Sequence, residues 1–447
     1  MNPTTGRLDA IQSRADGEAQ RLKHMLDHMD TNRAYIHARA LRGGDLDGRL
    51  LQEFRDRFRW YRESWRALPR RAVEQKLTGS RFTDAGIPPL CVDIEVAALC
   101  DLACPFCYRQ FIATPDKIMA DELAFRLIDQ AADLGVPSMK FNWRGEPLLH
   151  PRLPELIAHA KRRGILETII NTNATCLDEK TAEALIDAGL DLIIYSFDGG
   201  SKASYERMRP GRFKENSFDD VYGNIRRFAN IRAAKGSVFP RTKIQMILTE
   251  ETFTERDNFY LLFEDCVDDV SVKQYTERGG KLSGLDEPTR QRLGKALAGR
   301  NLSSDTPFFR DKDDKLFVAT GRLPCEQPYQ RLLITYDGRA GMCCYDWGAQ
   351  HPVGYADKLT IELGESEYTG IVERARAGGK GFIQLKAVDM PKQYNRLSPV
   401  VQTLSEIWTG HEIDAVRTAH VEGRVGDIDI CKACPFKETY RWEAIEE

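Results

Sequence analysis

"CVDIEVAALCDLACPFCY", residues 91–108, joins a short β-rich run to three closely spaced cysteines. The run at 91–96 predicts a strand. Asp101, Pro105 and Tyr108 give the following segment the polarity of a loop. The stretch therefore predicts a cysteine-bearing loop directly beyond the end of a strand.

The same kind of β-rich run recurs five more times, and a stretch of helical period separates each run from the next. Strands separated by one helix must cross over to pair in parallel, which predicts an α/β fold with a partial (β/α)6 TIM-like barrel. A doubly wound sheet is the competing layout. In both, functional groups gather beyond the carboxyl ends of the strands. We expect strands at 138–143, 167–173, 192–198, 242–249 and 270–277, and helices at 120–134, 153–163, 178–188, 218–235 and 254–266.

The region before the barrel reads as helices without strands. Its best helix carries apolar residues at alternating spacings of three and four, and Pro69 is expected to end it. The arginine face of this helix is either a solvated surface or a binding surface for an anionic substrate, such as a nucleotide-linked sugar or a leader peptide. The apolar residues are Leu51, Phe54, Phe58, Tyr61, Trp65 and Leu68, and the arginines are Arg55, Arg57, Arg59, Arg62 and Arg66.

Changes in pattern divide the chain into four predicted parts. A helical N-terminal cap covers 1–87, the barrel covers 88–280, a polar linker covers 281–322, and a small cysteine-bearing domain covers 323–447.

The formal net charge of −3 over 447 residues gives no overall electrostatic reason to expect binding to nucleic acid or to a membrane. No apolar stretch has the length of a membrane span, and the N-terminus lacks a signal peptide. The eleven cysteines are an odd number in a chain without export signals, so reduced thiols are expected rather than disulfides. The protein is therefore predicted to be cytoplasmic, without a nucleic-acid or membrane partner.

Cys100, Cys104 and Cys107 are spaced to wrap one small inorganic core. Thiolates are the ligands of iron-sulfur clusters, and three of them would leave one iron of a [4Fe-4S] cube open to an external ligand. A zinc site completed by a distant residue is the alternative. Placement of these cysteines in the core is disfavoured by the polarity of the loop.

"CDLACPFCY" resembles the signature of the radical S-adenosylmethionine (SAM) enzymes, CxxxCxxC followed by an aromatic residue, here Tyr108. The resemblance implies a [4Fe-4S] cluster whose open iron binds the amino and carboxylate groups of SAM. It also implies a flavodoxin- or ferredoxin-type electron donor. Reductive cleavage of SAM would release methionine and a 5'-deoxyadenosyl radical that abstracts hydrogen from the substrate.

Further segments resemble SAM-binding positions of this family. "NWRGEPLLHP" is similar to its GGEP segment at Gly145, Glu146 and Pro147, whereas Arg144 replaces the first glycine. A close backbone approach at Arg144 requires its side chain to turn away or to contact a carboxylate or phosphate. "NTNAT" and "SFDGG" are either ordinary turn chemistry or, as the resemblance implies, cofactor contacts. The implied contacts are Asn173, Ser196 and Asp198, together with Gln245 in the fifth strand.

A second set of cysteines lies beyond the barrel. Two separated pairs of thiols can close a [4Fe-4S] cluster or a zinc site, and the spacing does not choose between them. The region resembles the SPASM and twitch extensions of radical SAM enzymes, which implies a second, auxiliary [4Fe-4S] cluster. Its ligands would be Cys325, Cys343, Cys431 and Cys434, with Cys344 as an alternative to Cys343.

The remaining candidates are single residues. Cys91, Cys176 and Cys266 are interpreted as structural, and His24 and His28 as a solvated helix face. His150 is a candidate proton relay. Substrate contact or proton transfer is expected of Lys273, Tyr275, Glu277 and Arg278, with a strand-end salt bridge as the alternative.

We interpret the chain as a radical SAM oxidoreductase or epimerase that acts on an anionic, polar small molecule such as a carbohydrate or nucleotide sugar. The first 87 residues lack the strand–helix mixture of a leader-peptide recognition domain, and Arg144, Arg278 and the basic helix suit an anionic handle. Radical maturation of a ribosomally synthesised peptide is the first alternative. A non-catalytic iron-sulfur electron relay is the second.

Overall fold

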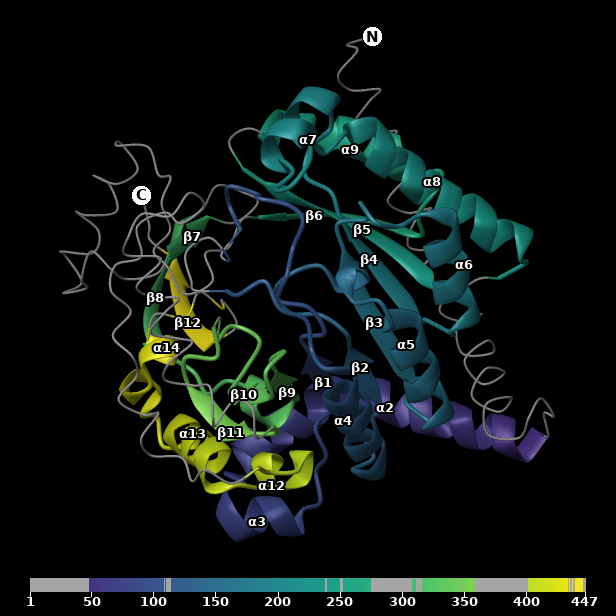
Figure 1. The fold of residues 1–447 in the computed structure, drawn as a ribbon. Helices are drawn as coiled ribbons and strands as arrows, with labels where there is room; N and C mark the ends of the chain where they lie inside the picture. The colour runs from purple at the N-terminus through teal and green to yellow at the C-terminus, as the bar shows by residue number, and fades with distance from the viewer. Residues whose placement is uncertain are drawn as a thin grey trace.

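A nine-stranded sheet forms the centre of the protein in the computed structural model (Figure 1). Its strand order is β11-β10-β9-β1-β2-β3-β4-β5-β6. The structure describes residues 48–107, 109, 114–237, 239–249, 252–274, 308–310, 316–346, 348–357, 401–432, 434, 436 and 439–444.

Strands β1 to β6 are parallel, and each pairs with the next one along the chain. A doubly wound sheet would reverse its order at a switch point, and the order from β1 to β6 does not reverse. The predicted partial (β/α)6 barrel is therefore confirmed. The strands are β1 (Cys91–Ile94), β2 (Ser138–Lys140), β3 (Glu167–Thr172), β4 (Leu192–Ser196), β5 (Arg241–Leu248) and β6 (Asp269–Gln274).

Helices cover the outer face of this sheet, with their apolar stripes packed on the strands (Figure 1). Asp178 and Ser217 cap the amino ends of two of them by accepting hydrogen bonds from backbone N–H groups. One short helix was not predicted: α7, which Ser201 begins with a capping box. The helices are α4 (Asp121–Asp133), α5 (Leu153–Arg162), α6 (Glu179–Asp187), α7 (Lys202–Met208), α8 (Phe218–Ala234) and α9 (Arg256–Phe263).

The prediction that Pro69 ends the basic helix is wrong, since α2 (Gly48–Glu74) continues through it. Proline lacks the N–H that would bond the carbonyl of Trp65 one turn earlier. The side-chain amide of Gln330 donates to that carbonyl instead, at 2.6 Å. A partner from a distant segment therefore satisfies the group that the proline leaves open.

Helix α2 lies at the amino ends of the strands. Phe58 and Tyr61 pack with Leu166, and the Tyr61 hydroxyl donates to Glu167, the first residue of β3, at 2.7 Å. The short helix α3 (Gly79–Asp84) follows α2 along the chain.

Part of the C-terminal region extends the barrel sheet. Strand β9 (Arg331–Ile334) pairs in parallel with β1 over four residues, so the sheet crosses the boundary predicted at residue 323. Strands β10 (Arg339–Gly341) and β11 (Pro352–Tyr355) continue it in antiparallel pairing.

A three-stranded sheet lies beside it, and two of its strands fall in the segment predicted as a linker. These are β7 (Phe308–Arg310) and β8 (Leu316–Arg322), and β8 pairs with β12 (Tyr440–Ala444) near the end of the chain. Among its described residues this part also contains the α-helices α12 (Leu404–Trp408), α13 (His411–Val421) and α14 (Asp429–Lys432).

Candidate functional site

The first cysteine loop leaves the carboxyl end of β1, as predicted, and a second segment holds it in place. The Ala103 N–H donates to the Pro210 carbonyl at 2.9 Å, and the Arg212 N–H donates to the Asp101 carbonyl at 2.8 Å. Arg212 also pairs with Asp116 at 2.6 Å. Backbone pairing on both sides thus fixes the path of the loop.

The three thiols of this loop differ in exposure. Cys104 is buried, whereas Cys100 and Cys107 are half-buried. Burial raises the pKa of Cys104 to about 12 and that of Cys100 further, so both are neutral thiols until a metal displaces their protons. The predicted aromatic neighbour, Tyr108, lies outside the described residues.

The segment after β2 packs directly on the cysteine loop. Gly145 has a φ of +57°, and a side chain there would overlap the carbonyl oxygens of Ala97 and Leu99. The next residue, Glu146, donates its backbone N–H to the Leu99 carbonyl at 2.8 Å. The buried Pro147 begins a 3-10 turn. The glycine is therefore required for this contact.

Glu146 places a carboxylate deep in this site, with only 2% of its surface exposed. It accepts hydrogen bonds from the hydroxyl of Thr172 at 2.6 Å and from the backbone N–H groups of Asn173 and Leu148. Burial nevertheless raises the pKa of Glu146 to about 7. A cation bound beside it would favour the ionised form.

Asn173 joins the third strand to the cysteine loop. Its side-chain amide donates to Asp101 at 2.8 Å, and the Thr175 hydroxyl donates to the same carboxylate at 2.5 Å. The predicted cofactor residue thus lies beside the cysteine loop, where its amide is already hydrogen-bonded within the protein.

Asp198 also binds other residues of the protein. Its carboxylate pairs with Arg209 at 2.5 Å and accepts from the Ile247 N–H at 2.6 Å. Ser196 and Gln245 are half-buried neighbours on adjacent strands. Sequence reasoning missed Arg209, which is buried. Its guanidinium carbon lies 5.9 Å from the centroid of the Phe106 ring on the cysteine loop.

Arg144 contacts a carboxylate inside the protein. Its guanidinium binds both carboxylate oxygens of Glu95, at 2.5 and 2.7 Å, and both side chains are buried. The sequence analysis left this outcome open, but it also counted Arg144 as a handle for an anionic substrate. That expectation is wrong, because the charge of Arg144 is matched by Glu95 inside the protein.

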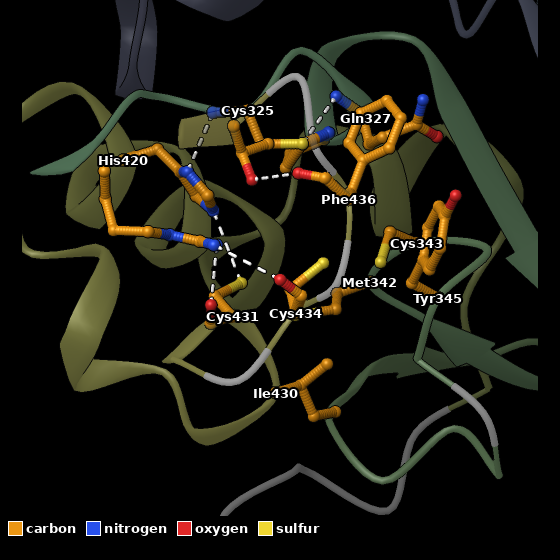
Figure 2. Close-up of a pocket in the computed structure, with 13 residues that line it drawn as sticks. Cys325, Gln327, Met342, Cys343, Tyr345, His420, Ile430, Cys431, Cys434 and Phe436 are labelled. Atoms are coloured by element: carbon orange, nitrogen blue, oxygen red, sulfur yellow. Dashed lines mark hydrogen bonds between the residues drawn. The ribbon is translucent and has the colours of Figure 1, made fainter. Parts of the chain in front are cut away.

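Figure 2 shows the second cysteine set around a cavity with about 360 Å³ of space not filled by atoms, part of which is open to solvent. The four predicted ligands, Cys325, Cys343, Cys431 and Cys434, all line it. Cys344 is outside this lining, and its thiol donates to Gln327 at 3.6 Å. In the part of the chain that the structure describes, no three His, Cys, Asp or Glu side chains are arranged to hold a single metal ion.

Two residues that sequence reasoning missed hold this cavity together. His420 accepts the Cys325 N–H on Nδ1 at 3.0 Å, and its Nε2 lies 3.5 Å from the Cys431 sulfur. Burial, with the nearby charge of Arg322, lowers the pKa of His420 to about 4. Arg322 donates to the Cys431 carbonyl at 2.6 Å. A single histidine in an amphipathic helix carries no signal for such a role.

The remaining candidates are placed as follows. His150 is buried, and both ring nitrogens have backbone partners: Nε2 faces the Met119 carbonyl, and Nδ1 accepts the Arg152 N–H. Cys91 and Cys266 are buried, Cys176 is half-buried and Lys273 is exposed. His24, His28, Tyr275, Glu277 and Arg278 lie outside the described residues.

Among the described residues, no helix combines the length and the apolar character that a membrane span needs.

The model of the radical SAM superfamily matches residues 94–262. A PqqA peptide cyclase from Granulibacter bethesdensis is 38% identical over 122 residues, 27% of this chain and 32% of the relative. A GTP 3',8-cyclase from Chlorobaculum tepidum is 34% identical over 128 residues, 28% of this chain and 38% of the relative. These matches therefore span about a third of the length of the curated relatives.

Solved structures with a similar arrangement were also found. SuiB from Streptococcus suis bound to the precursor peptide SuiA is 20% identical, with a TM-score of 0.44 over 64% of this chain and 67% of that one. BtrN in complex with AdoMet and 2-DOIA is 16% identical, with a TM-score of 0.41 over 78% of this chain and 94% of that one. The cysteine loop at the end of β1 lies within residues 94–262, the part of the chain that is similar to the radical SAM superfamily.

Proposed function

We propose that this chain is a radical SAM enzyme with two iron-sulfur clusters and that its substrate is a ribosomally made peptide. The observation that carries the first part is the three-cysteine loop at the end of β1, on which the Gly145–Glu146 segment packs. A loop with three thiols and no fourth suits a cube with one open iron.

The residues present fit the cofactors of the superfamily. Cys100, Cys104 and Cys107 would hold the first [4Fe-4S] cluster, and Glu146 supplies a buried carboxylate beside it for the amino end of SAM. The bound pair supplies reductive cleavage of SAM to a 5'-deoxyadenosyl radical, with an electron from a flavodoxin- or ferredoxin-type donor. Asn173 and Asp101 hold the loop, and Asp198 fixes the end of β5.

The second cavity supports an auxiliary [4Fe-4S] cluster held by Cys325, Cys343, Cys431 and Cys434. Four thiols line one cavity, which is the ligand set that a [4Fe-4S] cube needs. Cys343 lines this cavity and Cys344 does not, which favours Cys343 as the ligand.

Two observations weaken the anionic small molecule as substrate. Arg144 is paired with Glu95. Helix α2 packs at the amino ends of the strands, and the cysteine loop lies at their opposite, carboxyl ends. The PqqA peptide cyclase relative favours a peptide. The GTP 3',8-cyclase relative keeps a nucleotide as the second candidate. The substrate test described below also identifies the type of reaction, which is an oxidation, an epimerisation or a cross-linking.

The test of radical chemistry is anaerobic reconstitution of the full chain, followed by SAM and dithionite, with 5'-deoxyadenosine as the measured product. We expect it from the wild type and from Cys266→Ala, whose thiol lies in the turn between α9 and β6, but not from Cys107→Ala. No product from protein with intact clusters would support the electron relay and overturn the proposal.

The test of the substrate compares peptides encoded beside the gene with GTP. Mass spectrometry should detect a peptide that has lost hydrogen atoms or gained deuterium from solvent, and 5'-deoxyadenosine should increase with peptide concentration. An increase with GTP and none with the peptides would favour the second candidate.

A further inference from the structure

His420 occupies a bridging position in the second cysteine site. It projects from α13 and is 1% exposed. Its two ring nitrogens face different chain segments: the backbone N–H of Cys325, just after β8, and the sulfur of Cys431, on α14 (Figure 2). One side chain therefore links two of the four thiol-bearing residues.

The hydrogen bond at Nδ1 decides the tautomer of this ring. A backbone N–H can only donate, so the Nδ1 that receives it from Cys325 at 3.0 Å must be unprotonated. The proton of the neutral imidazole is then on Nε2. Nε2 lies 3.5 Å from the Cys431 sulfur, so the ring donates an N–H···S hydrogen bond to that atom.

A donor directed at a ligand sulfur affects the metal group that the sulfur holds. Reduction adds negative charge to an iron-sulfur cluster, and a hydrogen bond to a ligand sulfur stabilises that charge. The Gln327 N–H, 3.4 Å from the Cys325 sulfur, is a backbone donor of the same kind. His420 differs in being a side chain that a substitution can remove.

We propose that His420 is a positioning residue that orients Cys431 and raises the reduction potential of the second cluster through its Nε2–H···Sγ hydrogen bond. This rests on the proposed function, because it requires a cluster in the cavity of Figure 2. The role differs from that of a ligand, since neither nitrogen is left to bind iron.

The test uses the full chain with Cys100→Ala, Cys104→Ala and Cys107→Ala, so that only the second cluster remains. Redox titration followed by EPR compares this protein with the same protein carrying His420→Leu or His420→Gln. We expect His420→Leu to lower the equilibrium constant for reduction about tenfold, about 59 mV for a one-electron couple. Glutamine can accept from Cys325 and donate to Cys431, so it should retain most of the wild-type potential.

The outcomes separate the two proposals. Loss of all iron from the three-alanine protein would overturn the second cluster itself, and this inference with it. Retained iron with equal potentials in the three-alanine protein and in its His420→Leu variant would overturn only the role of His420.

A spectroscopic measurement decides the question even if both His420 variants lose the cluster. In protein labelled with ¹⁵N-histidine, electron-nuclear double resonance of the reduced second cluster should detect a weak nitrogen coupling and an exchangeable proton. No coupling would overturn the proposal, and so would the strong coupling of a directly bound nitrogen.

Discussion

Two adjacent residues, Arg144 and Gly145, show how the loop after β2 serves both structure and cofactor site. Gly145 lets the backbone lie against the carbonyls of Ala97 and Leu99, while Arg144 sends its charge into the interior to Glu95. The difference from the family's usual glycine therefore does not block the contact with the cysteine loop.

Gly145→Ala should disrupt this contact. The added methyl would overlap two backbone oxygens and keep a positive φ, which together cost about 2–4 kcal/mol in the free energy of unfolding. Gly135→Ala is the matched control, because Gly135 also has a positive φ but open space around its Cβ. Chemical denaturation and iron content measure the difference, and equal losses in both variants would contradict the argument.

Removing Arg144 should be more harmful than removing the whole ion pair. Arg144→Met leaves the buried Glu95 carboxylate without its counter-charge, which costs roughly 3–5 kcal/mol. Adding Glu95→Gln to Arg144→Met should restore part of this stability, because the amide oxygen can still accept from the Tyr336 N–H. Urea titrations of the single and double variants measure it, and simple additivity would refute the coupling.

Glu146 should make the stability of the cofactor-free protein depend on pH. Its pKa is raised from an ordinary 4.5 to about 7, so the folded state holds a proton that the unfolded state releases first. Its contribution is complete below pH 4.5 and is lost as the pH rises to about 7, roughly 3 kcal/mol in all. Glu146→Gln should flatten this slope in pH-dependent denaturation, whereas the exposed Glu179→Gln should not.

At the scale of elements, helix α2 packs against the amino ends of the strands and stabilises them. Its continuation through Pro69 depends on Gln330, and its docking depends on the buried bond between Tyr61 and Glu167. Neither contact reaches the carboxyl end of the sheet, where the first cysteine loop lies.

Tyr61→Phe should therefore lower stability without changing the chemistry. It removes the buried hydrogen bond between the Tyr61 hydroxyl and Glu167, which costs about 1–3 kcal/mol. Formation of 5'-deoxyadenosine by the folded variant should be unchanged. Arg59→Glu reverses a charge on the exposed face of the same helix and should change neither quantity. A raised substrate KM in Arg59→Glu would instead support the hypothesis that the arginine face of α2 binds the substrate.

At the scale of the whole molecule, the barrel and the C-terminal region share one sheet. Strand β1 lies between β2 and β9, and Trp408 on α12 donates to the Ile87 carbonyl at 2.8 Å. The second cysteine site is therefore attached to the first through backbone pairing. The Trp143 indole, which donates to the Cys344 carbonyl at 3.2 Å, makes a further link.

A chain truncated after residue 322 should fail to fold as an independent barrel. It would lack β9 and expose the edge of a strand that is buried on both sides in the full chain. Soluble yield and circular dichroism of the truncated and full chains measure this. A stable, folded 1–322 fragment would show that the boundary predicted from the sequence is a true domain boundary.

The barrel could be predicted because its signals are local. Strand and helix periods alternate from Cys91 onward, and the cysteine spacing lies within one loop. The pairing of β9 with β1 could not be predicted, since it joins short segments that are far apart in the chain. The roles of Arg209, Gln330 and His420 depend in the same way on partners that only folding brings near.

The buried pair of Arg144 and Glu95 also constrains how this protein can evolve. In a relative with glycine at position 144, a carboxylate at position 95 would be buried without its counter-charge. The two positions should therefore co-vary. We expect relatives with arginine at the first site to retain a carboxylate at the second, and relatives with glycine to carry a neutral side chain there.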